Sequence, residues 1–346
     1  MIRDDLEKKE KLILSPYASF STHSSGREYE EAEDEVRTCY MRDRDRIIHS
    51  KAFRRLKHKT QVYISPDSDH FRTRLTHTLE VAQIGKTIGR GLGLNEDLIE
   101  AIALAHDVGH TPFAHAGEEV LDRIMTSGFK HNYNSVRVLT KIERKSDKYP
   151  GLNLTREVLD GVLHHSGFNK SKEAANTLEG QVIRLSDKIA YVQHDIDDAL
   201  RAGTLVENDL PKKAIESLGK THGERIGALV YDAIHHSEKI LKQDEKASIS
   251  LSAQANQALI DLREFMFENI YLGDICQAER KKATIVIEYL YDYYYKNTDR
   301  LPVFYKKIVE EEGKEQGVAD YISGMSDNYC INLFRDLTIP RSYINL

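Results

Sequence analysis

The sequence predicts an all-α protein, a helical globule with a C-terminal helical extension and at most a short β-hairpin. Strand-like segments are scarce, and the main candidate covers residues 60–64, before Ser65-Pro66. Apolar residues recur at helical spacing along most of the remaining chain. Of the 346 residues, 40% are hydrophobic and 30% are charged, and no apolar run approaches the roughly 18 residues of a membrane helix. We therefore expect a folded protein without membrane spans.

The first half of the chain contains two helices whose ends the sequence marks clearly. A first helix is predicted to end at Gly93, which can adopt the left-handed backbone conformation of a helix end. Asn95 is a predicted N-cap, and acidic residues follow it in the first turn. The segment from Leu98 to His106 is apolar almost all round, so we expect this second helix to be buried, with a break at Pro112. Apolar positions at helical spacing mark the first helix: Leu75, Leu79 and Ala82.

Two further helices and a long helical remainder are predicted beyond this break. The third begins near Thr155, and the fourth runs from about Glu179 to Arg201 and ends at Gly203. From residue 204 onwards the pattern is again helical, and its tyrosine-rich stretch at 289–295 either packs against neighbouring helices or stacks on nucleic-acid bases. We divide the chain into residues 1–60, a core of 61–203, and a C-terminal region of 204–346.

Charge and cysteine usage argue against two classes of protein: those drawn to DNA or anionic membranes by their net charge, and those held together by disulfides. A net charge of −6 gives no overall attraction to DNA or anionic membranes. Three cysteines, Cys39, Cys276 and Cys330, are far apart and fit free thiols in a reducing compartment. One basic stretch stands out at residues 42–59, where eight arginines and lysines face two aspartates. This stretch is either a solvated helix face or a patch that binds phosphate.

Ionisable residues are densest between positions 105 and 118. The His106-Asp107 pair ends an apolar helix, where burial is costly unless both groups have partners. His110, His115 and Glu118 follow within a short distance. A divalent cation would compensate a buried carboxylate and accept imidazole nitrogens, so the cluster suggests a metal site.

Two other helices carry residues that could complete such a site. His77 opens the first predicted helix. Asp187, Tyr191 and Asp195 follow one another at i+4 steps on one face of the fourth helix. Because this face lies opposite the apolar stripe, a solvated polar face explains it equally well.

The order of these residues, His77, His106-Asp107 and Asp187, resembles the H…HD…D pattern of the HD superfamily of metal-dependent phosphohydrolases. Longer stretches resemble the bacterial deoxyguanosine triphosphate triphosphohydrolases, including HDVGHTPFAHAGE, LEGQVIRLSDKIAYVQHDIDDALRAG and, near the C-terminus, DYISGMSDNY. The resemblance is nearly continuous over residues 42–203 and resumes at about residue 320. It departs from the family at Ala114, where glycine is expected, and at Asn134, where glutamine is expected.

The resemblance implies an HD-domain core with one divalent metal ion, Mn²⁺, Fe²⁺, Mg²⁺ or Zn²⁺, bound by His77, His106, Asp107 and Asp187. It also implies hydrolysis of dNTPs, of dGTP or more broadly, to a deoxynucleoside and inorganic triphosphate. The implied catalytic residues are His110, His115, Glu118 and His131. The implied substrate-binding residues are Gln61, Arg74, Lys188, Tyr191 and Asp195, with Arg54 or Arg55 supporting the phosphates.

Among these residues the resemblance implies distinct roles. The Glu118 carboxylate would orient the His115 imidazole, and His131 would protonate the leaving 5′ oxygen. Tyr191 would pack against C2′ of the sugar, where a ribose hydroxyl would clash. Gln61 and Asp195 would bond the 3′ hydroxyl.

The family resemblance further implies a cytoplasmic enzyme that forms a tetramer or hexamer and takes a second dNTP as activator. One alternative is an HD phosphohydrolase of another nucleotide, such as a nucleoside monophosphate or an alarmone. A different class of function, a non-catalytic HD protein that binds single-stranded nucleic acid weakly, is motivated by the basic stretch and the tyrosines.

Overall fold

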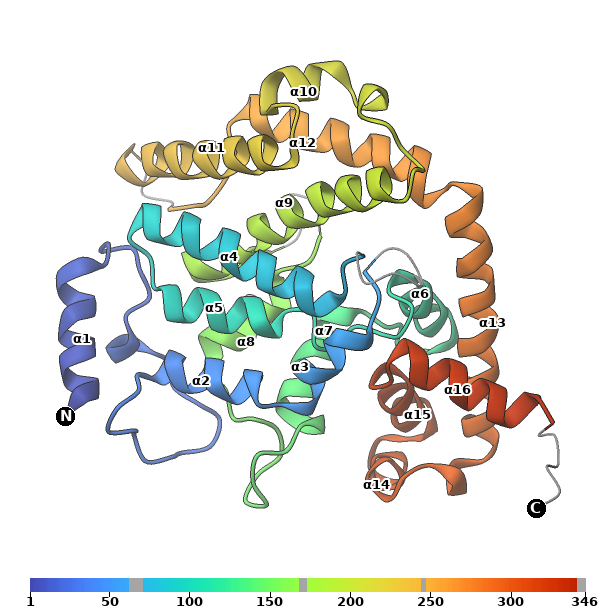
Figure 1. Ribbon diagram of the computed structural model, residues 1–346. Coiled ribbons are helices and arrows are strands. Elements are labelled where there is room, and N and C mark those ends of the chain that lie inside the picture. The colour runs from blue at the N-terminus through green and yellow to red at the C-terminus, as the bar shows by residue number, and fades with distance from the viewer. Residues whose placement is uncertain (62–70, 168–172, 244–246, 341–346) are drawn as a thin grey trace, which may run out of the picture.

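The computed structural model confirms the all-α fold (Figure 1) and describes residues 1–61, 71–167, 173–243 and 247–340. These residues form sixteen α-helices and no β-strand, and strand-like pairing is limited to isolated bridges such as Thr60 with Thr73. Most of the strand predicted over 60–64 lies outside the described residues. Among the helices that are described, none is long and apolar enough to cross a membrane.

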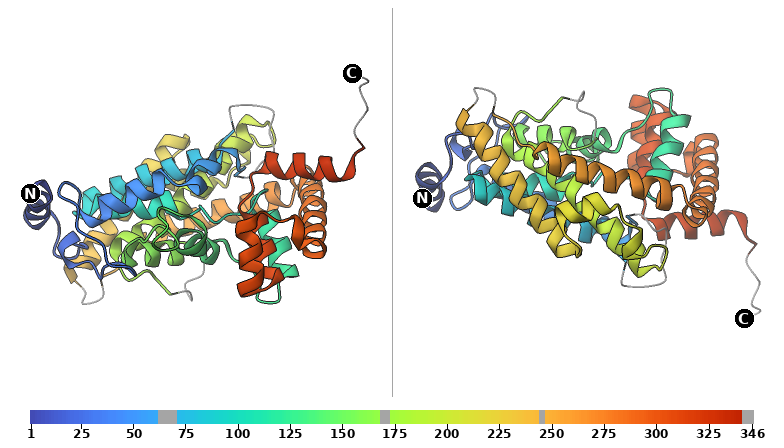
Figure 2. Two further views of the ribbon diagram at one scale, coloured as in Figure 1. Left: turned by 90° about the horizontal axis from the view of Figure 1, so that it is seen from below. Right: turned by 90° about the horizontal axis from the view of Figure 1, so that it is seen from above.

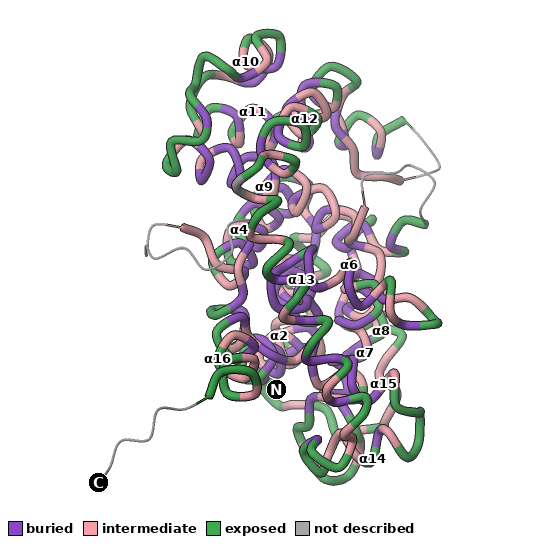
Figure 3. The backbone as a smooth tube through the Cα atoms, turned by 90° about the vertical axis from the view of Figure 1, so that its right-hand side faces the viewer, coloured by how far each residue is buried: buried purple, intermediate pink, exposed green. Residues whose placement is uncertain are grey.

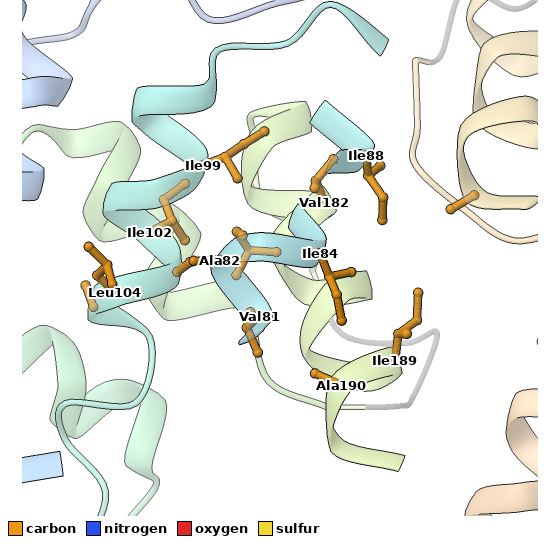
Figure 4. Close-up of a cluster of buried hydrophobic side chains, with 14 of the residues drawn as sticks. Val81, Ala82, Ile84, Ile88, Ile99, Ile102, Leu104, Val182, Ile189 and Ala190 are labelled. Atoms are coloured by element: carbon orange, nitrogen blue, oxygen red, sulfur yellow. The ribbon is translucent and has the colours of Figure 1, made fainter. Parts of the chain in front are cut away.

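Four helices from the segment predicted as the core, residues 61–203, form the interior of the protein. α4 packs against both α5 and α9, and α8 packs against α5 and α9 as well. Fully buried aliphatic side chains meet between them, including Ile84, Ile102 and Val182 (Figure 4). Because burying such side chains stabilises the fold by about 2 kcal/mol each, this packing fixes how the helices are placed. The bounds are α4 (Arg74–Leu92), α5 (Glu96–Ala105), α8 (Arg156–His164) and α9 (Leu178–Arg201).

The predicted N-cap and two of the predicted helix ends are confirmed, whereas α5 already ends at Ala105, before the break predicted at Pro112. Gly93 closes α4 with a φ of 68°, and Gly203 follows α9 with the same positive φ. The Asn95 side chain accepts hydrogen bonds from the backbone N–H groups of Asp97 and Leu98 at 3.2 and 3.3 Å, as an N-cap does.

N-terminal segments cover one side of this interior and explain the basic stretch. Arg42 and Arg46 both donate to the Glu31 carboxylate, and Arg44 donates to Asp97 at 2.9 Å. These arginines are therefore used in ion pairs within the fold, so neither a solvated face nor a phosphate patch describes this part of the stretch. The helices are α1 (Ile2–Ile13), α2 (Cys39–Ile48) and α3 (Lys51–Arg55).

The C-terminal helices lie over two different parts of the molecule (Figures 1 and 2). One group covers α4 and α9: α10 (Lys212–Leu218), α11 (His222–Gln243) and α12 (Ala253–Met266). A π-helical turn (Phe267–Tyr271) then leads into the second group. In Figure 3, much of α10 and of α14 (Val303–Glu312) is exposed, whereas the helices of the interior are mostly buried. The second group contains α13 (Asp274–Lys296), α14 (Val303–Glu312), α15 (Lys314–Ser323) and α16 (Asp327–Thr338).

This second group builds a separate hydrophobic cluster with α6 (His115–Ile124). Tyr291 and Tyr294, each 5% exposed, belong to that cluster, so these two tyrosines pack helices together. The remaining helix, α7 (His131–Arg137), packs against α8 near the interior. The division of the chain at residues 60 and 203 stays a prediction.

We predict that replacing Glu31 by glutamine lowers the stability by about 1–3 kcal/mol near neutral pH, because two arginines lose a charged acceptor. Burial opposes ionisation of Glu31, but hydrogen bonds from Tyr149 and Arg46 outweigh it and lower its pKa from 4.5 to about 2. A lowered pKa stabilises the fold above 4.5, and this contribution is lost as the pH falls towards 2.

Urea unfolding of both proteins between neutral pH and pH 3 measures this difference. The difference in unfolding free energy between wild type and Glu31→Gln should become smaller as the pH falls. Glu33→Gln is the matched control, because the Glu33 side chain is 78% exposed. A difference in unfolding free energy that is constant with pH would contradict the lowered pKa of Glu31.

Candidate metal centre and active-site cavity

The four predicted metal ligands meet at one point, although three separate parts of the chain supply them. His77 comes from α4, His106 and Asp107 follow the end of α5, and Asp187 comes from α9. The Asp187 Oδ1 atom lies 3.1 Å from Nε2 of His77 and 3.8 Å from Nε2 of His106. The Asp107 Oδ2 atom lies 3.5 and 4.0 Å from the same two nitrogens.

The Nε2 atom of His106 supports a cation site at this point. The Nδ1 atom lies 2.6 Å from the Ala103 carbonyl oxygen and donates its proton there, which fixes the orientation of the ring. The Nε2 atom is buried, faces the two carboxylates and has no hydrogen-bond partner. A buried polar atom without a partner is unfavourable, and a metal ion between the imidazole and the carboxylates would supply that partner. Two imidazoles and two carboxylates are a donor set that Mn²⁺, Fe²⁺, Mg²⁺ or Zn²⁺ accepts.

Nearby charges keep both carboxylates ionised. Burial raises the pKa of Asp107, but His106 and Arg74 outweigh this effect and hold it well below its ordinary value. The Arg74 guanidinium donates to Asp107 at 2.6 Å and is itself buried. For Asp187, burial is likewise outweighed, by the hydrogen bond with His77, and its pKa falls to about 2.

A second group of ionisable residues lies beside the metal ligands and is organised by Glu118. Nδ1 of His131 lies 3.0 Å from both carboxylate oxygens of Glu118, and Nδ1 of His115 lies 3.5 Å from one of them. Burial opposes ionisation of Glu118, but these two histidines outweigh it and lower its pKa. One carboxylate thus orients two of the three imidazoles that the resemblance implies to be catalytic.

A further histidine, His165, was missed by the sequence analysis and determines the state of His131. Its Nδ1 donates to the Val162 carbonyl oxygen at 2.6 Å, so its Nε2 accepts from Nε2 of His131 at 3.2 Å. His131 therefore donates from both nitrogens, which requires the doubly protonated form. Burial lowers the pKa of His131, but the Glu118 carboxylate outweighs this and raises it. The adjacent pair His164-His165 was the available signal.

His110 lies between the two groups. Its ring stacks on His131, with centroids 4.0 Å apart, and its Nε2 lies 3.5 Å from Asp107. Burial, with the positive charges of Arg74 and His131, lowers its pKa well below the ordinary value. A neutral His110 ring beside the protonated His131 ring avoids placing two like charges in contact.

A cavity of about 370 Å³ lies beside these groups, and its lining residues include His77, Asp107, His110, His115 and His131. Asp187 and Tyr191 of α9 line it, and Asp195 is only 1% exposed, so the solvated-face interpretation of this helix is wrong. Asp195 does not line the cavity, because its carboxylate accepts a hydrogen bond from the Tyr271 hydroxyl. Tyr271 stands in front of it as part of the lining.

The other predicted substrate contacts divide into two sets. Gln61, Arg74 and Lys188 line the cavity, and burial together with Arg184 lowers the pKa of Lys188 to about 8. Arg54 and Arg55 are not among the lining residues; Arg55 lies 3.6 Å from Glu143 instead.

The far wall of the cavity comes from the C-terminal half and was not predicted. This wall lies in the segment between residues 204 and 320, for which no family resemblance was identified from the sequence. The α12 helix, the π-helical turn and α13 bring to it two arginines, two aromatic residues and a cysteine: Arg263, Arg280, Phe267, Tyr271 and Cys276. Arg280 is paired with Glu119 at 2.6 Å. Only tertiary packing brings these residues to the metal ligands.

Comparison with known proteins identifies two domains by sequence. The HD domain family model matches residues 74–192, and the phosphohydrolase-associated domain matches residues 249–336. A deoxyguanosinetriphosphate triphosphohydrolase-like protein of Clostridium tetani is 56% identical over 345 residues, which cover 99% of this chain and 98% of that protein. Its counterpart in Clostridium perfringens strain 13 is 54% identical over 340 residues, 98% of each chain.

Among solved structures, a phosphohydrolase from Bacteroides thetaiotaomicron superposes with a TM-score of 0.51. The match covers 85% of this chain and 68% of that one, at 14% sequence identity. This likeness supports the fold alone.

We predict that Mn²⁺ raises the melting temperature of the wild type and leaves that of His106→Ala unchanged, because the variant lacks the unpartnered Nε2. At a metal concentration about 100 times the Kd, binding should stabilise the fold by about 2.7 kcal/mol. Thermal unfolding with and without metal measures the shift. His164→Ala is the control: His164 pairs with Asp160 and does not line the cavity. An undiminished shift in His106→Ala would contradict the site.

Proposed function

Because this chain belongs to the family of HD-domain deoxyguanosinetriphosphate triphosphohydrolase-like proteins, we propose that it hydrolyses dNTPs, dGTP or a broader set, to a deoxynucleoside and inorganic triphosphate. One observation carries the proposal: predicted metal ligands and cationic side chains line the same cavity. Three of the four predicted ligands, His77, Asp107 and Asp187, are among its lining residues, and Nε2 of the fourth, His106, lies 3.5 Å from Asp107. That combination suits a substrate with several negative charges.

His77, His106, Asp107 and Asp187 would hold the metal, as the unpartnered Nε2 of His106 supports. When bound, a divalent cation lowers the pKa of a coordinated water and neutralises charge on a phosphate oxygen. Which cation serves is open, because affinity order is a poor guide to the metal used in cells.

Cationic side chains on the cavity wall would bind the triphosphate. Arg74 and Lys188 are buried or half-buried there, and Arg263 adds a positive charge from the opposite side. In a site that excludes much of the water, such charges stabilise phosphate oxygens more strongly than exposed ones do.

Two histidines would move the protons of the reaction. With Nδ1 of His115 directed at Glu118, its Nε2 is left to take a proton from the attacking water. The water attacks the α-phosphorus, and the bond to the 5′ oxygen breaks. His131, held in the doubly protonated form by Glu118 and His165, would give a proton to that leaving oxygen. His110 would lie beside the α-phosphate.

The sugar would be recognised by the face of α9. Tyr191 would pack against C2′ and so select a deoxyribose, and Gln61, whose Oε1 is buried without a hydrogen-bond partner, would accept from the 3′ hydroxyl. Asp195 reaches the cavity through its hydrogen bond with Tyr271, so a direct contact with the 3′ hydroxyl requires Tyr271 to turn aside.

Four properties that the family implies stay predictions: a tetramer or hexamer, activation by a second dNTP, manganese as the metal used, and a cytoplasmic location. Weak binding of single-stranded nucleic acid receives less support, because arginines of the basic stretch pair with carboxylates within the fold.

We predict that metal-loaded protein incubated with all four dNTPs releases deoxynucleoside and triphosphate, while His106→Ala and Asp107→Ala release neither. Anion-exchange chromatography separates the products, and the dNTP that is depleted identifies the base preference. Release of phosphate from nucleoside monophosphates, without turnover of dNTPs in any combination, would instead support an HD phosphohydrolase of another nucleotide.

Replacing His131 by asparagine should lower kcat by about 10²–10⁴-fold with little change in KM, because the leaving oxygen loses its proton donor. Because Glu118 outweighs burial and raises the pKa of His131, the acid form persists to higher pH than in a free imidazole, and wild-type kcat should fall as this proton is lost. The pH profile of kcat measures both effects. In His131→Asn the alkaline fall should shrink to the part that deprotonation of Lys188, whose pKa is about 8, contributes, whereas His164→Asn should keep the whole fall. An undiminished fall in His131→Asn would exclude His131 as the acid.

A further inference from the structure

A single buried carboxylate outside the cavity connects two segments that carry site residues. Asp327, the first residue of α16, is 2% exposed. Its Oδ2 accepts from the backbone N–H of Thr60 at 3.0 Å and from the Thr60 hydroxyl at 2.6 Å, and its Oδ1 accepts from the backbone N–H of Phe113 at 2.9 Å. Thr60 directly precedes Gln61, and Phe113 lies two residues before His115.

The segment held at Phe113 has an unfavourable backbone conformation. Phe113 and Ala114 have φ values of 59° and 52°, and Ala114 has a ψ of −130°. Residues with a Cβ rarely adopt such conformations, and glycine is favoured there. Strain of this kind persists only where surrounding contacts enforce it. The Thr111 hydroxyl, which donates to the Ala114 carbonyl oxygen at 2.9 Å, supplies one such contact, and Asp327 supplies another.

A second buried contact connects the same parts of the molecule. The Lys59 ammonium, 2% exposed, donates to the carbonyl oxygens of His110 and Ser323. Lys59 precedes Thr60, His110 lies three residues before Phe113, and Ser323 ends α15. The α15–α16 junction is therefore joined at two points to the segments that bring Gln61 and His115 to the cavity.

Capping of its own helix does not explain Asp327. The N-cap of α16 is Ser326, whose hydroxyl accepts from the Tyr329 N–H at 3.3 Å. Within the described residues, the hydrogen bonds that Asp327 accepts come from Thr60 and Phe113, which are 267 and 214 residues away in the chain. The carboxylate therefore acts between segments, and it does not line the cavity.

We propose that Asp327 is a positioning residue for the reaction: it holds the strained Phe113-Ala114 segment so that His115 faces the cavity, and it fixes Thr60 so that Gln61 does the same. The loss of turnover expected when Asp327 is replaced rests on the proposed function, whereas the effect of Asp327 on the placement of the Phe113-Ala114 segment does not. Small displacements of catalytic groups reduce turnover strongly even where the fold persists.

Asp327→Asn tests the proposal, since it keeps the shape of the side chain but replaces one acceptor oxygen with a donor. In hydrogen–deuterium exchange followed by mass spectrometry, peptides covering residues 108–116 should exchange at least about 10-fold faster than in the wild type, and peptides of α5 and α9 should not change. Ser326→Ala is the matched control: it removes the cap of the same helix and should leave exchange of residues 108–116 as in the wild type.

Kinetics distinguish positioning from a general loss of stability. In Asp327→Asn, kcat should fall by about 100-fold at a temperature where the variant is fully folded, with metal binding retained. Ser326→Ala should keep kcat even if it melts earlier. In the double variant Asp327→Asn, Ala114→Gly, part of kcat should return, because glycine adopts the required backbone conformation without strain.

Unchanged exchange at residues 108–116 in Asp327→Asn, or faster exchange with an unchanged kcat, would overturn the positioning role. If Asp327→Asn does not fold, Thr60→Val, which removes only the hydroxyl contact at 2.6 Å, should give a smaller change in the same direction, and no change would count against the proposal. A wild type that hydrolyses no dNTP refutes the proposed function separately, and exchange then still decides whether Asp327 holds the segment.

Discussion

The buried charges at the wall of the cavity are the constraint on which the rest of this structure depends. Asp107 and Asp187 are held in the protein interior beside two imidazoles, and one imidazole nitrogen of His106 faces them without a hydrogen-bond partner. Such an arrangement is stable only with a positive charge nearby, which Arg74 provides in part and a divalent cation would complete. Three helices must therefore be packed accurately for these groups to meet, and the aliphatic core between α4, α5 and α9 achieves this.

Carboxylates elsewhere in the molecule have a related task, because each one orients several neighbouring groups. Glu31 accepts from Arg42 and Arg46 and so removes basic side chains from the surface. Glu118 orients two histidines with one carboxylate, and Asp327 holds the two segments that bring Gln61 and His115 to the cavity. In each case one acid is satisfied by more than one donor, which makes the local geometry specific.

The C-terminal helices complete the cavity as well as the fold. Residues of α12, the π-helical turn and α13 form its far wall, and Tyr271 covers Asp195 there. The α15–α16 junction contacts the segment that precedes His115. The site thus consists of an N-terminal metal centre and a C-terminal wall.

From the sequence alone, the helices around the core could be predicted, because periodic apolar residues and caps such as Asn95 are local features. The His106-Asp107 pair suggested a metal site in the same way, whereas His77 and Asp187 were assigned to that site by the resemblance to the HD superfamily. Local features also placed Gly93 and Gly203 at helix ends. The state of His131, the pairing of the basic stretch and the far wall of the cavity were decided only by tertiary structure. Each of these depends on contacts between residues far apart in the chain, and no pattern within one segment specifies which distant partner a buried charge or ring will meet.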